Sequence, residues 1–140
     1  RYPYLAGGRP SRLPGVTDLK ALARGAAIVA TADPFHHGIG YGDAPEDSLA
    51  AGSGGMELAR RRIEEGLRLL ERGEHGAYNA HCVDAKSDAR DVGQVLRHLV
   101  GPCACEVLDT VWSDMSEAYG APEPTWVAGA LVAVRTTCGA

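Results

Sequence analysis

The residues with the clearest chemical potential lie in the run Asp33-Pro34-Phe35-His36-His37-Gly38. A carboxylate three residues before an imidazole can orient the ring and favour its charged form, which suits proton transfer near neutral pH. The structural alternative is that Asp33 caps a turn, His36 packs beneath a loop and His37 is solvated. We keep both interpretations open, and Asp33, His36 and His37 are the candidate catalytic residues.

The position of this run in the chain favours a functional interpretation. It follows residues 26–31, which are apolar on both faces and therefore typical of a central strand covered by helices on each side. In open α/β sheets, ligands bind at the carboxyl ends of strands, because the loops there converge on a crevice. We therefore expect the two histidines to follow a buried strand at such an edge.

A second group of polar residues, 81–91, offers a thiol, an imidazole and carboxylates just before a predicted helix. These soft and hard ligand types together select no metal, and helix capping with a buried Cys82 explains the group more simply. Cys103 and Cys105 lack a second cysteine pair at the spacing of a zinc site, so we interpret them as core packing. His75 and His98 have no partner that the sequence identifies.

The elements that must position these residues follow from periodicity and from glycine and proline signals. Thr17 and Asp88 are predicted helix caps, and the glycine-rich stretch 38–55 is a predicted long loop. The predicted order is a strand at 2–6, a helix from 17 to 25, a strand at 26–31, helices at 56–72, 74–81 and 89–100, and strands at 106–113 and 126–134. This order predicts the α/β class, with a mixed parallel and antiparallel sheet covered by helices.

Composition limits the classes of protein. The chain has 140 residues, 45% hydrophobic and 23% charged, which suits one globular domain or half of a larger one and excludes disorder. Its net charge of −4 argues against nucleic acid as a partner. Four unevenly spaced cysteines fit a reducing cytoplasm better than a disulfide scaffold. The longest apolar run, 126–134, is about half the length of a membrane-spanning helix, so no membrane association is expected.

The segment 28–38 resembles the "V-V-S-S-D-F-x-H-x-G" segment of MEMO proteins, which belong with the class III extradiol ring-cleaving dioxygenases. Three further segments extend the resemblance over nearly all of the chain. Residues 63–70 and 92–96 resemble later helices of that family, and 126–131 resembles its terminal "S-Y-A-A-G-A-L" strand. The opening residues 2–8 are similar to its mid-chain "V-P-V-L-V-G" strand.

The resemblance implies a role for each candidate residue. His36 matches the histidine that acts as acid and base in the ring-cleaving enzymes, and Asp33 matches the carboxylate before it. The third iron ligand of those enzymes is a carboxylate at the start of a helix, for which Asp91 is the first choice and Asp88 the second. MEMO proteins have a cysteine near that place, where this chain has Ser87. A carboxylate there restores a two-histidine, one-carboxylate set that suits Fe(II).

The resemblance also implies that part of the site lies elsewhere. The family takes two histidine ligands from the first half of its chain, so residues 1–140 would form a C-terminal half-domain of an extradiol-dioxygenase-like fold. A companion chain or an N-terminal half would supply those histidines. An isolated half would expose the apolar faces of 26–31 and of the last strand, which favours association into an oligomer.

The function that follows is that of an oxidoreductase, a non-haem Fe(II) oxygenase of the extradiol type acting with O₂ on a catechol or related phenol. The alternative is a catalytically silent, MEMO-like metal-binding or protein-interaction module. A structural zinc on Cys103 and Cys105 is a third interpretation, which the missing second pair disfavours.

Overall fold

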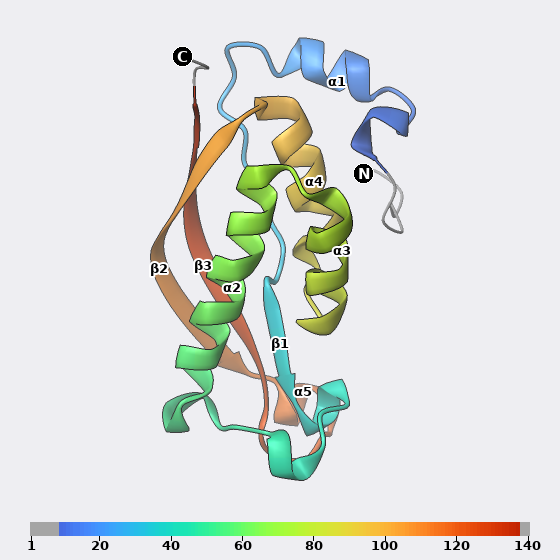
Figure 1. Cartoon of the computed structure of the whole chain (residues 1–140). Helices are drawn as coiled ribbons and strands as arrows, with labels where there is room; N and C mark the ends of the chain where they lie inside the picture. Colours follow the sequence, from blue (N-terminus) through green and yellow to red (C-terminus); the bar gives the residue numbers. More distant parts are fainter. Residues whose placement is uncertain (1–8, 138–140) are drawn as a thin grey trace.

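The computed structural model describes residues 9–137 and shows a mixed α and β architecture (Figure 1). The helices are α1 (Val16–Leu22), α2 (Gly55–Arg72), α3 (His75–Asp84), α4 (Ala89–Val100) and α5 (Ser116–Tyr119), and the strands are β1 (Phe35–Gly38), β2 (Cys103–Asp114) and β3 (Thr125–Thr136). Three short 3₁₀ turns, Ile39–Tyr41, Pro45–Asp47 and Ala51–Ser53, shape the predicted long loop. The predicted strand at 2–6 lies outside the described residues.

The sheet has the strand order β1-β3-β2, and both pairings are antiparallel. In the register, His36 lies opposite Val127, and Trp112 lies opposite Ala128. The prediction of two paired closing strands is confirmed. The prediction of a mixed sheet is wrong for the described part of the chain, because the expected extra strand at 26–31 does not enter the sheet.

Residues 27–34 run as an extended segment that forms no strand (Figure 1), which corrects the prediction of a buried central strand at 26–31. The Val29 residue is 86% exposed. Among the described residues, the segment 27–34 takes part in one backbone hydrogen bond, which the Asp88 N–H donates to the Asp33 carbonyl. A strand needs a neighbour about 4.8 Å away, and the described residues supply none. The strand begins instead at Phe35, so both histidines lie within the sheet rather than in the loop after it.

The exposure of Val29 gives a direct prediction for stability. Val29→Ser should change the free energy of unfolding of this chain by less than about 0.5 kcal/mol, because surface substitutions away from packed groups rarely do more. Urea denaturation followed by circular dichroism measures this change. A loss of about 2 kcal/mol would mean that the side chain is buried as the sequence suggests.

The helix α2 packs on the sheet through an amphipathic face, as its three- and four-residue spacing predicts. The helix is terminated after Arg72 by Gly73, whose φ of 69° lies in the left-handed region that glycine readily adopts. The principal core cluster unites α2, β1 and β3 with two loop positions, and its buried members are Phe35, Ala51, Ala59, Ile63, Ala85, Trp126 and Ala128. The buried side chains of β1 therefore fix the histidines against this core.

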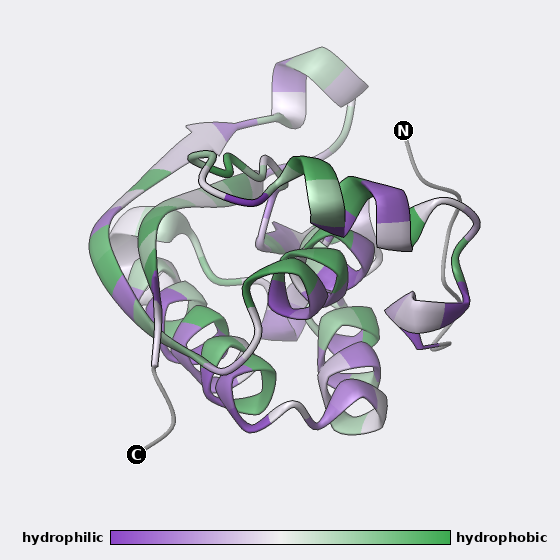
Figure 2. Cartoon of the chain, turned by 90° about the horizontal axis from the view of Figure 1, so that it is seen from above, coloured by the Kyte–Doolittle hydropathy of each residue, from purple (hydrophilic) through white to green (hydrophobic). Residues whose placement is uncertain are grey.

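The helices α2, α3 and α4 lie on the same side of the curved sheet (Figures 1 and 2). The strand β2 exposes Leu108, Val111 and Trp112, and β3 exposes Leu131. The expected helical cover on both faces is therefore present on one face of the described sheet. Among the described residues, no helix combines the length and the apolar character needed to cross a membrane.

Candidate functional site

His36 is held in a fixed orientation by the segment that precedes α4. Its backbone N–H donates to the Ala85 carbonyl at 3.3 Å, and its ring Nδ1 bonds to the carbonyl oxygen of Lys86. Lys86 has a φ of 51°, a left-handed conformation that is uncommon for a residue with a side chain. A carbonyl oxygen only accepts hydrogen bonds, so Nδ1 is the donor and the neutral ring carries its lone pair on Nε2.

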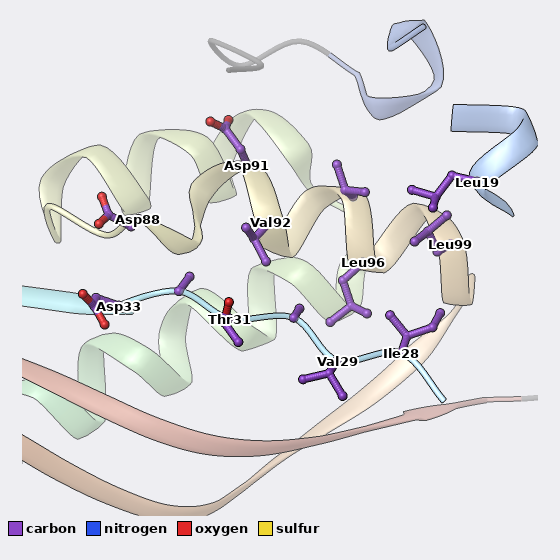
Figure 3. Close-up of a pocket in the computed structure, with 13 residues that line it drawn as sticks. Leu19, Ile28, Val29, Thr31, Asp33, Asp88, Asp91, Val92, Leu96 and Leu99 are labelled. Carbon is purple, nitrogen blue, oxygen red and sulfur yellow. The ribbon is translucent and has the colours of Figure 1, made fainter. Parts of the chain in front are cut away.

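The Nε2 atom of His36 faces two carboxylates. It lies 3.9 Å from Oδ2 of Asp33 and 4.0 Å from Oδ2 of Asp88. One donor atom from each of the three residues lies within 4.8 Å of the other two. Figure 3 shows Asp33 on the extended segment and Asp88 just before α4, on facing sides of the same opening. The structure therefore brings Asp88 to Asp33 and His36, which lie more than fifty residues earlier in the sequence.

Asp33 and Asp88 are also joined through their backbones. The Asp88 N–H donates to the Asp33 carbonyl at 2.9 Å, and the Ser87 hydroxyl donates to the same carbonyl at 3.5 Å. Asp88 occupies the N-cap position of α4, as predicted, but its side chain makes no capping hydrogen bond. The Ser87 hydroxyl oxygen instead accepts from the Ala89 N–H at 3.1 Å. The Asp88 side chain consequently stays available to the site.

The ring of Tyr41 packs against the His36 imidazole at a tilted angle, a contact that no sequence pattern indicated. Its ring lies 4.7 Å from that of His36, and Tyr119 packs against it at 5.7 Å. Burial raises the pKa of Tyr41 well above its usual value, with the nearby charges of Asp33 and Asp88 acting in the same direction. Its hydroxyl is therefore protonated at neutral pH. A lone tyrosine in a glycine-rich loop gives no periodic signal that would have identified it.

His37 points away from the carboxylate pair and has both ring nitrogens engaged. Nδ1 lies 3.0 Å from Oδ2 of Asp43, and Nε2 accepts from the Leu49 N–H at 3.0 Å. Phe35 stacks on the ring at 5.7 Å, and Trp126 meets it edge-on at 5.5 Å. Burial lowers the pKa of His37, although the Asp43 carboxylate opposes the shift. These contacts anchor the 38–55 loop to β1.

A groove of about 1250 Å³ runs from the carboxylate pair between α4 and the extended segment. Its walls are mainly apolar, and Val92, Leu96 and Leu99 of α4 line it opposite Ile28 and neighbouring residues (Figure 3). The groove thus connects an apolar surface, large enough for an aromatic ring, with a polar end that carries carboxylate oxygens.

Asp91, the first choice for a carboxylate ligand, also lines the groove but lies outside the three-residue cluster. Its Oδ1 lies 4.0 Å from Nε of Arg90. Asp88, the second choice, is the carboxylate that the structure places beside His36. Three residues, a little less than one helical turn, separate the two candidates.

The cysteines form no zinc site in the described structure. The group of described residues whose donor atoms could hold a metal ion contains neither Cys103 nor Cys105. Burial raises the pKa of Cys105 to about 12. Burial also raises the pKa of Cys82. Both thiols are free, as is Cys103.

Comparisons with known protein families, with curated proteins and with solved structures find no match to this chain.

Proposed function

We propose that this chain is the C-terminal half of a non-haem Fe(II) oxygenase of the extradiol type that acts on a catechol or a related phenol. The observation that carries the proposal is the placement of His36, whose ring is fixed through Nδ1 while Nε2 faces two carboxylates at the end of an apolar groove. The resemblance of segment 28–38 to the MEMO and extradiol motif supports the same assignment.

The residues of this chain fit the part of the iron site that this chain would supply, which is one carboxylate ligand. Asp88 offers a carboxylate oxygen 4.0 Å from Nε2 of His36, and a carboxylate is the ligand that a facial two-histidine, one-carboxylate site requires. The two nitrogen donors would come from outside the described residues. When bound, the ion would supply coordination of the phenolic oxygens and of O₂ beside the groove.

This chain's own residues would bind the substrate and move a proton. The groove walls of α4 and the extended segment would bury the aromatic ring. Nε2 of His36 would accept a proton from a substrate hydroxyl and return it during ring opening. Asp33, at 3.9 Å, would stabilise the resulting imidazolium, and the Lys86 carbonyl would hold the ring in place. Tyr41 would shield the imidazole from water.

Oxygen uptake tests this proposal. The protein, purified with any polypeptide that accompanies it, is loaded with Fe(II) under anaerobic conditions and supplied with catechol or 2-aminophenol. We expect one O₂ to be consumed per ring opened, with both oxygen atoms in the product by mass spectrometry of an ¹⁸O₂ reaction. Iron retention without oxygen uptake would reject the oxygenase and favour the silent metal-binding module.

A further inference from the structure

We infer that this chain alone holds a divalent first-row transition-metal ion through three donors: Oδ2 of Asp33, Nε2 of His36 and Oδ2 of Asp88. The inference deepens the proposed function at the same site, but it needs no second polypeptide, no phenol and no O₂. It also differs from that proposal in assigning the imidazole to the ion, where the oxygenase would use it to carry a proton.

The first support is the imidazole itself. The His36 side chain is 10% exposed, and Nε2 makes no hydrogen bond to any residue that the structure describes. Nε2 is therefore directed at the opening between the two exposed carboxylates, and the Lys86 carbonyl prevents the ring from exchanging its two nitrogens. A metal-ligating histidine characteristically donates its other ring N–H to a carbonyl or carboxylate, which orients the coordinating nitrogen. His36 has this arrangement before any ion binds.

The second support is the separation of the donors. Two ligands of one first-row ion lie about 3 Å apart, given metal–ligand bonds near 2 Å. The observed separations from Nε2, 3.9 Å and 4.0 Å, need to close by about 1 Å. Both carboxylates are more than half exposed and can rotate, while the backbone bond between residues 33 and 88 keeps their origins together. Solvent can therefore deliver the ion to a site whose one rigid donor is already in position.

The third support is charge. One oxygen from each carboxylate approaches within 4.8 Å of the other and of Nε2, so the two negative charges repel across the site. The Lys86 ammonium pairs with a different carboxylate, that of Asp43. A divalent cation would neutralise both carboxylates at once.

The donor types define the class of ion. Two carboxylate oxygens and one imidazole nitrogen suit Mn(II), Fe(II), Co(II) and Zn(II), whereas Ca(II) prefers six to eight oxygens. Three donors leave further coordination positions for water or for nitrogen ligands from another polypeptide. Because Nε2 has a single lone pair, His36 can act in proton transfer only when such ligands replace it at the ion.

The experiment is a titration of the purified chain with Mn(II) and with Co(II), without phenol and under argon, by isothermal calorimetry. We expect one ion per chain, with a change in the visible absorption of Co(II). His36→Ala, Asp33→Asn and Asp88→Asn should each weaken binding roughly 100-fold, because even changes to residues outside a coordination shell cost 10–100-fold. Asp47→Asn, which alters an exposed carboxylate in the 38–55 loop, should bind as the unaltered chain does.

Unaltered affinity in His36→Ala, or no saturable binding of Mn(II) or Co(II), would overturn the inference. The two asparagine variants keep the test decisive if the alanine variant fails to fold, because Asp33 and Asp88 are exposed side chains. Absence of oxygen uptake would reject the oxygenase but leaves the titration unaffected, so the two proposals fail independently.

Discussion

His36→Ala should lower oxygen consumption by the assembled, iron-loaded protein about 10²–10⁴-fold, which is the usual contribution of a positioned general acid–base. The reason is geometric, since Nε2 is the one ring nitrogen aimed at the end of the groove and its orientation is set by the Lys86 carbonyl. The loss should appear mainly in kcat, because the apolar walls that would bind the ring remain intact. An oxygen electrode with catechol as substrate measures it.

The matched control is His98→Ala, which removes an imidazole from α4 beside a separate small cavity and should leave turnover unchanged. The assembled His36→Ala protein should retain its iron, because Asp88 and two nitrogen donors from elsewhere would still hold it. Unchanged turnover in His36→Ala would reject the assigned proton transfer. Loss of iron from the assembled variant would show that the imidazole remains a ligand there too.

The helices were predictable because their signals are local. The predicted helices 56–72 and 89–100 correspond to α2 at Gly55–Arg72 and α4 at Ala89–Val100. In both, apolar residues recur at three- and four-residue intervals and a glycine follows the last turn. Neither feature depends on what the helix packs against, so one sequence suffices to find it.

Residues 26–31 were wrongly predicted to form a strand, because a strand depends on a neighbouring strand with which to pair. Their run of small and branched apolar residues is typical of a buried strand, yet the described chain places no strand beside them. The β propensity of a residue describes the conformations that it tolerates, whereas the pairing of two strands depends on the whole fold. The same limit applies to the histidines, which were expected after a strand and lie within one.

The candidate site could be only partly predicted for the same reason. Asp33 and His36 are three residues apart, so their proximity is visible in the sequence, whereas Asp88 lies more than fifty residues later and was selected through the resemblance. The contacts of His37 with Asp43, Leu49 and Trp126, which engage it in packing, arise only when the 38–55 loop folds back onto β1.

The two tryptophans of the chain should differ sharply in their contribution to stability. Trp126 on β3 is 2% exposed, contacts Phe35 and His37, and donates from Nε1 to the Leu49 carbonyl at 2.8 Å. Trp126→Ala removes the largest side chain of the core and leaves that carbonyl without its donor, so we expect a loss of about 3–5 kcal/mol in the free energy of unfolding. That is a large share of the 5–15 kcal/mol typical of a domain.

Trp112 on β2 provides the matched comparison, since it lies opposite Ala128 in the sheet but is 50% exposed. Trp112→Ala should cost less than about 1 kcal/mol, because a partly exposed ring gives up far less buried surface. Urea denaturation followed by far-ultraviolet circular dichroism measures both variants without relying on tryptophan fluorescence. Equal losses would mean that the outer face of β2 is covered in solution. The expected difference would show that Trp126 supplies the stabilising contacts of the 38–55 loop. Trp126 contacts Leu49 and His37, and these contacts hold β1 and therefore His36 in place.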